Sequence, residues 1–196
     1  PEDIRYHLEK ALYMAATGRP GPVWLDLPLD VQGAIIETES LRAYDPAENP
    51  EQRPQEILQE TIEKILDKIE ESHRPVLSPG NGVRLAGAIE EFHELVDVLG
   101  VPVVTGMSSV DALESDHPYF VGRSGGTGTR PGNFALQNSD VLLSIGNRQG
   151  FAQTGFQYQD WARESYTILN DIDENELKKP NLHVSLPVVV RNKRDC

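Results

Sequence analysis

The chain has 196 residues and a formal net charge of −13, from 18 Lys and Arg against 31 Asp and Glu. This excess of carboxylates argues against nucleic-acid binding, because affinity for phosphate backbones comes mainly from clustered cations that release counterions. With 38% hydrophobic and 25% charged residues, the composition is that of a globular protein, and the length fits one domain with an appended segment.

The sequence carries no sign of membrane insertion, export or metal chemistry. No apolar run approaches the roughly 20 residues that span a bilayer, and the N-terminus has no signal-peptide pattern. We therefore expect a soluble, cytoplasmic protein without membrane partners. The single cysteine, Cys196, excludes an intrachain disulfide and argues against a cysteine nucleophile, because it stands at the chain end. The five histidines are scattered without metal-site spacing, so we expect no metal site.

The first part of the chain predicts a helix and a short strand that lead into a linker. Apolar side chains recur at helical spacing over residues 2–17, and a run rich in glycine and proline follows. A short strand is expected at 23–28. A helix and a strand before a linker are typical of the end of a preceding domain, and the chain opens on Pro1 directly into a helical pattern. We therefore expect a fragment with three parts: the tail of a preceding domain at 1–33, a polar linker at 34–54 and a nucleotide-binding-like domain at 55–196.

Helical and strand patterns alternate regularly after the predicted linker. Helices are expected at 57–69 and 85–99, and Gly100 ends the second of them. Strands that are apolar on both faces and separated by helices indicate an α/β fold with a parallel sheet covered on both sides. The predicted strands are 75–80, 101–105, 119–121, 140–145, 166–170 and 183–186.

Glycines gather at the carboxyl ends of these predicted strands. Ligands of an open parallel sheet bind outside those ends. Glycine lets a backbone approach a ligand closely, and a helix N-terminus offers free N–H groups to phosphate. The alternative for each glycine is a tight turn without a ligand. Five such ends together favour a nucleotide-sized ligand, and they are 80–82, 105–107, 122–126, 146–148 and 170–173.

The spacing of these glycines argues against a nicotinamide dinucleotide. Gly80 and Gly82 are followed by Gly87, which is two positions later than the third glycine of the G-x-G-x-x-G fingerprint. The next strand also ends in Thr105 and Gly106, where an acid that binds ribose is expected. A different dinucleotide in a different register remains an alternative.

Residues 122–126 match the G-x-S-x-G nucleophile elbow of hydrolases, and an aspartate and His183 follow in the hydrolase order. The elbow requires a helix that begins directly after the serine, here Ser124. The glycine-rich run 125–132 cannot sustain a helix. The hydrolase interpretation is therefore disfavoured, and Ser124 is expected to be a polar loop residue.

Charged residues near the glycine turns are further candidate ligand contacts. A guanidinium at Arg148 or Arg19 could clamp a phosphate or a carboxylate, although a solvated arginine without a ligand is the alternative. Asp171 and Asp173 lie at a predicted strand end. There a carboxylate could accept a hydrogen bond from a ribose hydroxyl or cap the helix that follows.

Many short motifs occur in a fixed order along the chain: Gly18-Arg-Pro-Gly-Pro-Val-Trp-Leu-Asp-Leu-Pro-Leu-Asp-Val-Gln32, Arg74-Pro-Val, Gly80-Asn-Gly82, Gly100-Val-Pro-Val-Val-Thr105, His117-Pro, Gly132-Asn-Phe-Ala135, Ser139-Asp-Val-Leu-Leu-Ser-Ile-Gly-Asn-Arg148 and Asp171-Ile-Asp173 with Glu176-Leu-Lys-Lys179. The first resembles the segment that closes the pyrimidine-binding domain of thiamine-diphosphate enzymes of the acetolactate synthase type. The others resemble the central domain of these enzymes, so the resemblance covers nearly the whole chain.

This resemblance implies the fold class and a cofactor. The central domain of such enzymes is a doubly wound, six-stranded parallel sheet of the Rossmann-like α/β type, and in acetolactate synthases it holds the ADP half of FAD. Carried over by position, the FAD contacts would come from Arg19, Gly80, Asn81, Gly82, Thr105, Gly106, Met107, Gly122, Arg123, Gly146, Arg148, Asp171 and Ile172.

The resemblance also implies what the parent enzyme does. It would decarboxylate a 2-oxo acid such as pyruvate on thiamine diphosphate, held with Mg, and transfer the acyl unit to an acceptor. The catalytic glutamate and the Gly-Asp-Gly motif with paired asparagines belong to the other two domains, and no such motif occurs here. We therefore expect no catalytic residue in this chain. Its partners would be the missing pyrimidine- and diphosphate-binding domains, in a homodimer or homotetramer.

Several positions depart from the family pattern. Gly150, Phe151 and Ala152 stand where synthases that bind FAD usually have Asp-Asp-Arg. Leu29 replaces a lysine usual in plant and fungal synthases, and Val189 replaces an aspartate near the flavin. Segments 133–138 and 153–157 look more like paralogues found with polysaccharide-sugar genes. Two alternatives therefore stand beside the FAD-binding synthase: a cofactor-free spacer domain, and a parent that transfers the acyl unit to an activated sugar.

Overall fold

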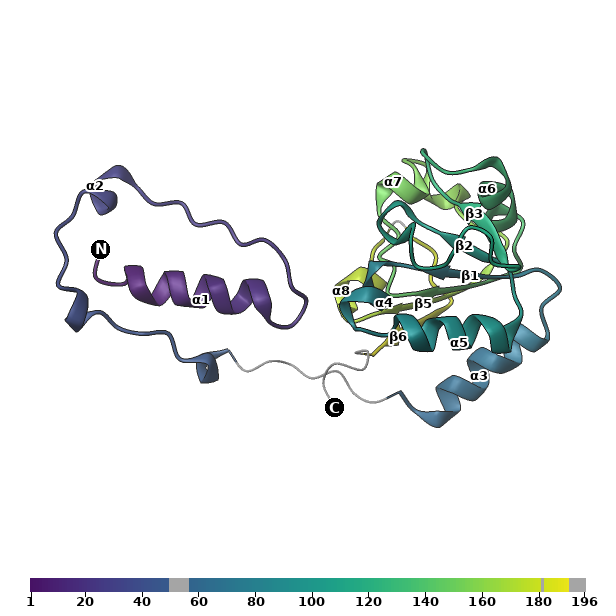
Figure 1. The fold of residues 1–196 in the computed structure, drawn as a ribbon, viewed down its shortest axis with the longest axis horizontal. Coiled ribbons are helices and arrows are strands. Elements are labelled where there is room, and N and C mark those ends of the chain that lie inside the picture. Colours follow the sequence, from purple (N-terminus) through teal and green to yellow (C-terminus); the bar gives the residue numbers. More distant parts are fainter. Residues whose placement is uncertain (50–56, 181, 191–196) are drawn as a thin grey trace. The chain divides into compact units, whose positions relative to one another are not determined.

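The computed structural model describes residues 1–49, 57–180 and 182–190 (Figure 1). The chain divides into two compact units, Pro1–Arg53 and Pro54–Cys196, and each is described by itself. The division into a domain tail at 1–33, a linker at 34–54 and a domain at 55–196 stays a prediction.

The second unit is built on a six-stranded sheet in the order β3-β2-β1-β4-β5-β6, in which all neighbouring strands are parallel. The chain proceeds outward from β1 to β3, returns to place β4 beside β1, and then proceeds outward on the other side. The reversal creates a topological switch point between β1 and β4. The predicted doubly wound sheet is therefore confirmed. Its strands are β1 (Pro75–Pro79), β2 (Val103–Thr105), β3 (Phe120–Arg123), β4 (Val141–Ile145), β5 (Tyr166–Asp171) and β6 (Leu186–Val189).

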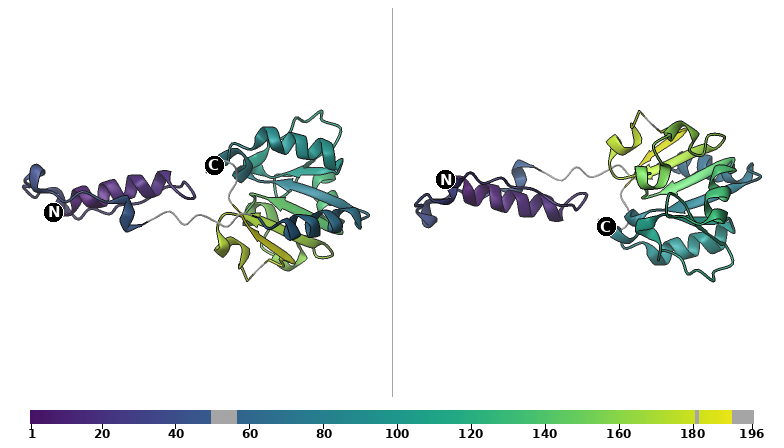
Figure 2. Two further views of the ribbon diagram at one scale, coloured as in Figure 1. Left: turned by 90° about the horizontal axis from the view of Figure 1, so that it is seen from below. Right: turned by 90° about the horizontal axis from the view of Figure 1, so that it is seen from above.

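Helices cover both faces of this sheet (Figures 1 and 2). Helices α3 and α5 pack on one face and α6 packs on the other. The short helices follow strand ends. The helical elements of this unit are α3 (Gln59–Glu70), α4 (Asn81–Leu85), α5 (Ile89–Leu99), η3 (Met107–Ser109), α6 (Arg130–Gln137), α7 (Phe151–Thr154), η4 (Tyr158–Asp160) and α8 (Glu174–Leu177).

Alternate strand residues enter two separate cores. Leu77 of β1 packs with Phe92 of α5, whereas its neighbour Val76 packs with Leu136 of α6 and with Trp161. All five side chains are at most 9% exposed. Because both faces of each strand are buried, the strands are apolar at consecutive positions. This pattern is why the strands could be predicted from the sequence.

The first unit contains α1 (Ile4–Ala16), α2 (Leu29–Gln32), η1 (Thr38–Ser40) and η2 (Pro46–Glu48). Tyr44 packs edge-on against Tyr6 of α1, with 5.5 Å between the ring centroids. The Tyr6 hydroxyl donates to Glu48, and the backbone N–H of Tyr44 donates to Glu9, both at 2.8 Å. Part of the predicted linker is therefore folded against α1.

Three predicted elements differ in the structure. The strand predicted at 23–28 is wrong: no strand lies among residues 1–49, so the extended segment has no partner to pair with. The strand predicted at 183–186 lies instead at Leu186–Val189, where β6 pairs with β5. The helix predicted at 85–99 begins only at Ile89, as α5; Leu85 ends the preceding helix α4, and Gly87 between them adopts a φ of +67°.

Candidate nucleotide-binding site

The loops after β1 and β4 meet at the switch point, backbone against backbone. Gly82 donates its N–H to the carbonyl of Gly146 at 2.9 Å. A Cβ at Gly80 would lie 2.2 Å from the Gly146 oxygen, and a Cβ at Gly82 would lie 2.7 Å from the Gly146 Cα. Each glycine is therefore required by the opposite loop. The glycine pattern alone does not establish a ligand here.

Buried hydroxyl groups tie together the ends of β1, β2 and β3. Ser109 donates to the carbonyl of Pro79 at 2.7 Å and accepts from the N–H of Gly106 at 3.0 Å. The Gln153 side chain of α7 donates to Ser124 Oγ at 2.9 Å. These contacts make the edge a single hydrogen-bonded layer rather than a set of independent loops.

A second polar network lies directly under the switch point. Gln149 is 4% exposed, and its side-chain amide donates to Ser144 Oγ of β4 at 2.8 Å. Its N–H donates to Asn147 Oδ1, and Asn147 donates to Ser78 Oγ of β1, each at 3.2 Å. Gln149 holds a φ of +51°, which is uncommon for a residue with a Cβ. Gln149 Oε1 and Thr105 Oγ1 are buried oxygens without a hydrogen-bond partner in the described residues.

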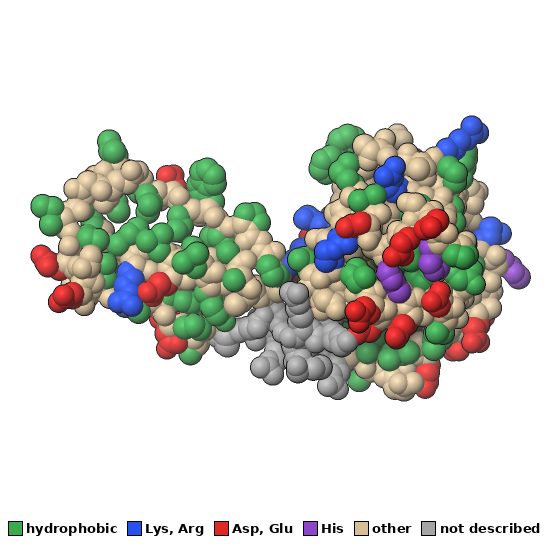
Figure 3. Space-filling model, in the orientation of Figure 1, with side chains coloured by type: hydrophobic (Ala, Val, Ile, Leu, Met, Phe, Trp, Pro, Cys, Tyr) green, Lys and Arg blue, Asp and Glu red, His purple; other side chains and the backbone are tan. Residues whose placement is uncertain are grey.

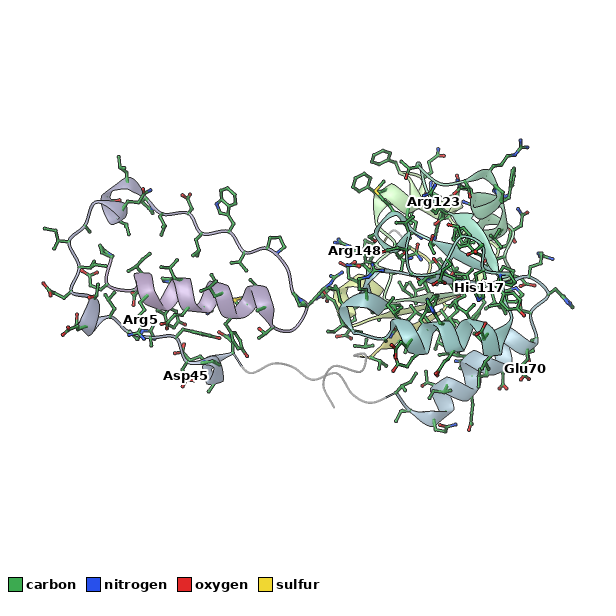
Figure 4. The ribbon with its side chains drawn as sticks, in the orientation of Figure 1. Arg5, Asp45, Glu70, His117, Arg123 and Arg148 are labelled. Atoms are coloured by element: carbon green, nitrogen blue, oxygen red, sulfur yellow. The ribbon has the colours of Figure 1, made fainter. Side chains whose placement is uncertain are left out.

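Arg148 projects from this edge, at the end of β4 (Figure 4). Its side chain is 62% exposed, and its Nη2 lies 3.5 Å from Oε1 of Glu176, a carboxylate that is only 10% exposed. Lys179 contacts the other oxygen of Glu176 and also donates to the backbone carbonyl of Arg148 at 2.8 Å. The end of β4 is therefore joined to α8 through both the backbone and the side chain of Arg148.

The two aspartates after β5 organise the start of α8. Asp171 is 4% exposed and accepts the N–H of Asp173 at 2.9 Å. Asp173 in turn accepts the N–H of Asn175 at 2.9 Å and so caps α8. Of the two roles predicted for Asp173, helix capping is confirmed.

The glycine-rich loop after β3 does not form a nucleophile elbow. Ser124 is 3% exposed, and its Oγ bonds to Gln153 and to the carbonyl of Thr105. The next helix, α6, begins only at Arg130, where Thr129 accepts the N–H of Gly132. The prediction that no helix begins directly after Ser124 is confirmed. The expectation that 125–132 sustains no helix was wrong for its last three residues, since the cap and a proline in the first turn stabilise α6 there.

The sheet brings most of the sequence-predicted contacts to one edge. Arg19 lies in the first unit, so the sheet does not position it. Of the remainder, Met107, Arg123 and Arg148 are exposed, and the others are buried or half-buried. The residues that share the carboxyl edge of the sheet are Gly80, Asn81, Gly82, Thr105, Gly106, Met107, Gly122, Arg123, Gly146, Arg148, Asp171 and Ile172.

The family model described as "Thiamine pyrophosphate enzyme, central domain" matches residues 62–194, a range that contains the whole six-stranded sheet. The chain belongs to the thiamine pyrophosphate enzyme family. The predicted resemblance is thereby confirmed.

Among curated members of the thiamine pyrophosphate enzyme family, similar proteins carry the name acetolactate synthase large subunit. The chain is 37% identical to a probable acetolactate synthase large subunit of Methanocaldococcus jannaschii, over 96% of this chain and 32% of that protein. It is 36% identical to one of Methanococcus aeolicus, over 91% and 30%, and to the acetolactate synthase large subunit of Corynebacterium glutamicum, over 96% and 30%. The chain thus spans about a third of the length of the curated relatives it matches.

Two of the departures from the family pattern lie in and beside α7. Phe151 stacks on Phe156, with 5.8 Å between ring centroids and 19° between the planes. The two rings are 64% and 81% exposed, and Figure 3 shows hydrophobic side chains at the surface over α7. At Gly150, the space that a Cβ would occupy is open. An apolar surface therefore stands where the resemblance implies charged side chains.

Metal binding and membrane insertion find no support in the described part of the chain. There, no group of three or more His, Cys, Asp and Glu side chains is arranged to hold a metal ion. None of the helices within residues 1–49, 57–180 and 182–190 is both long enough and apolar enough to cross a bilayer.

Sequence reasoning did not single out the side chains of Asn147, Gln149 and Gln153, although Asn147 lies within the predicted strand end 146–148. Their side-chain amides donate to Ser78 of β1, Ser144 of β4 and Ser124 in the loop after β3, between 5 and 69 positions away. The sequence feature that could have indicated Asn147 and Gln149 is the run of polar residues directly after Gly146, at the end of a predicted strand. Glu176 and Lys179 were noticed only as part of a motif, and their contact with Arg148 was not predicted.

Proposed function

We propose that this chain is the central part of a thiamine-diphosphate-dependent enzyme of the acetolactate synthase type. The parent would decarboxylate a 2-oxo acid such as pyruvate and transfer the acyl unit to an acceptor. Support comes from the family match and from the names of relatives that this chain matches over more than nine-tenths of its length. In this proposal the thiamine diphosphate supplies the electron sink. No motif for it or for Mg occurs in these residues, so this chain is not itself catalytic.

We propose further that the carboxyl edge of the sheet binds the ADP half of FAD. The observation that carries this proposal is the exposed guanidinium of Arg148 at the switch point, beside the glycine loops that follow β1 and β4. Arginine matches phosphate in shape and charge. Gly82 and Gly146 would lie against the diphosphate, and Asp171 could accept from the ribose. These groups fit a nucleotide diphosphate, and the bound FAD would supply a redox-active ring.

A specific observation favours the alternative, a cofactor-free spacer. Gly80, Gly82 and Gly146 fit against one another, and the side chains of Gln149 and Gln153 occupy hydrogen-bonding positions at the strand ends. Many of the hydrogen-bonding groups at this edge of the sheet therefore already have partners within the protein. The unpaired oxygens of Gln149 and Thr105 favour the nucleotide, because buried acceptors usually have a donor.

Partners within the parent are a further part of the proposal. Large apolar side chains of the first unit are exposed, among them Leu29 at 83%, Trp24 at 90% and Ile35 at 97%. Exposed apolar surface of this kind is typical of a protein interface. We infer that this unit is the end of a pyrimidine-binding domain and is covered by the remainder of that domain, within a homo-oligomer. The acceptor in this proposal is either a second 2-oxo acid or an activated sugar. The activated sugar is favoured by segments 133–138 and 153–157, which look like those of paralogues found with polysaccharide-sugar genes.

Calorimetric titration of the 196-residue chain with FAD and ADP tests the nucleotide proposal, with NAD and coenzyme A as comparisons. We expect micromolar binding of FAD and ADP. Arg148→Ala should weaken it about tenfold, since a charge-assisted hydrogen bond is worth about 1.5 kcal/mol or more. Arg163→Ala is the matched control, because Arg163 is exposed and pairs only with its neighbour Glu164 among described residues. Absence of binding for every nucleotide would favour the spacer.

A further inference from the structure

The contact between β4 and α8 places two cationic groups around one buried carboxylate. Glu176 has a cation on each oxygen: Arg148 at 3.5 Å on Oε1, and Lys179 on Oε2. A buried carboxylate is costly unless it is paired in this way. The three side chains together carry a net charge of +1. This cluster of three side chains therefore keeps a positive charge, although its carboxylate is buried.

Glu176 is itself held in place by the end of β5. Asp171 fixes the turn by accepting from Asp173, and Asp173 caps α8 through Asn175. This helix has only four residues, so its position depends on these caps and on its packing. Glu176, taken as a whole residue, is 8% exposed. The backbone that carries Glu176 is therefore held by the turn after β5, and its carboxylate contacts the loop that carries Arg148.

Lys179 contacts both residues of the ion pair between Arg148 and Glu176. Its ammonium neutralises Glu176 and donates to the backbone carbonyl of Arg148 at 2.8 Å, and its side chain is 23% exposed. Arg148, in contrast, is 62% exposed. A guanidinium carries five N–H donors, so one ion pair leaves donors accessible to a ligand.

We propose that Glu176 and Lys179 are positioning residues that hold Arg148 ready for the phosphate groups of a nucleotide. This inference rests on the proposed nucleotide-binding function and assigns the roles within it. Glu176 sets the direction of the guanidinium, and Lys179 sets the backbone from which it projects. Fixing a long side chain before binding lowers the entropy lost when the ligand binds.

The structure offers a matched control for both residues. Glu174 and Lys178 form an ion pair on the exposed side of the same short helix, where the two side chains are 62% and 65% exposed. Glu174→Gln and Lys178→Met remove the same charges without touching Arg148. A general effect of net charge would appear in both sets of variants, whereas a positioning effect would appear only in Glu176→Gln and Lys179→Met.

The experiment combines NMR of the arginine side chains with titration of ADP and adenosine into the full chain. The Nη–Hη signals of Arg148, assigned by their loss in Arg148→Lys, should be protected from solvent exchange, because Nη2 is the atom that contacts Glu176. We expect Glu176→Gln to remove this protection and to weaken ADP five- to tenfold, while the affinity for adenosine, which lacks phosphate, stays unchanged. Lys179→Arg should retain most of the wild-type ADP affinity. If Glu176→Gln does not fold, Lys179→Met tests the same contact at a less buried position.

Two results would overturn the inference, and they are distinguishable. If wild-type chain binds ADP and Glu176→Gln binds it equally, Glu176 does not position Arg148, although the nucleotide site stands. If the wild-type chain binds no ADP while Glu176→Gln still frees the Arg148 signal, the contact is structural only and the proposed nucleotide function itself fails.

Discussion

Among single residues of the switch point, Gly146 combines a left-handed φ with a close backbone contact. Its φ is +58°, and a Cβ there would lie 2.9 Å from the Gly82 Cα. Gly146→Ala should lower the free energy of unfolding by about 2 to 4 kcal/mol, since a left-handed conformation and a backbone clash add together. Gly126→Ala is the control, because no atom lies within 4 Å of its Cβ position. Urea denaturation measures both, and equal stability of the two variants would contradict the backbone contact.

Asp140 lies at the amino end of β4, at the edge of the sheet opposite to the candidate site. Its carboxyl makes the stability of the protein depend on pH. Burial raises the pKa of its carboxyl, but hydrogen bonds from Ser72 and from the N–H groups of His73 and Arg74 outweigh burial and lower the pKa to about 2. A carboxyl with a lowered folded-state pKa stabilises the protein above its ordinary pKa of 3.8, and this stabilisation is lost as the pH falls toward 2.

Asp140→Asn should therefore cost roughly 1 kcal/mol near neutral pH, after allowance for solvent screening. The difference from wild type should shrink as the pH falls through the range between the two pKa values. Thermal unfolding of both proteins at a series of pH values measures it. A difference that is constant down to about pH 2 would show that the carboxylate charge plays no part.

For secondary-structure elements, the cap of α6 is the feature that separates this loop from a hydrolase elbow. The Thr129 hydroxyl accepts the N–H of Gly132 at 3.3 Å and that of Arg123 at 3.1 Å. Thr129→Ala should destabilise the protein by about 1 to 2 kcal/mol, and Thr129→Ser should recover most of this loss. Chemical denaturation distinguishes them. Equal loss in both variants would mean that the methyl group, rather than the hydroxyl, stabilises the loop.

The strands were predictable where consecutive apolar residues enter two cores, as at Val76 and Leu77. Strand β6 was misplaced because it contains Pro187, which usually argues against a strand. As an edge strand it needs no partner on its outer side, so proline is tolerated there. Glycines of the site were likewise visible in the sequence. The contacts between these glycines could not be predicted, because they join segments that meet only in the folded chain. The same holds for the hydrogen bonds of Gln149 and the ion pairs of Glu176.

At the scale of the whole molecule, the two units differ in what holds them together. The second unit has two apolar cores, one on each face of its sheet. Among the described residues of the first unit, Tyr6 and Tyr44 are the buried hydrophobic side chains, and most others are exposed. A segment with so little buried surface rarely folds by itself. This contrast agrees with the proposal that the first unit belongs to a larger domain.

A peptide of residues 1–53 should therefore show no cooperative thermal transition, whereas a protein of residues 54–196 should unfold cooperatively. Circular dichroism of the two separate chains measures this. A sharp transition of the peptide would show that its tyrosine pair and backbone contacts suffice, and would remove the argument for a covering domain.

The central claim is that the carboxyl edge of the sheet takes a nucleotide diphosphate, and mapping of backbone amide shifts by NMR tests it most directly. The 196-residue chain is titrated with ADP and with FAD. We predict shifts confined to residues 80–82, 105–107, 146–148 and 171–173, with the largest changes around Arg148. The absence of shifts at saturating ligand, or shifts around Asp140 at the opposite edge, would contradict the account.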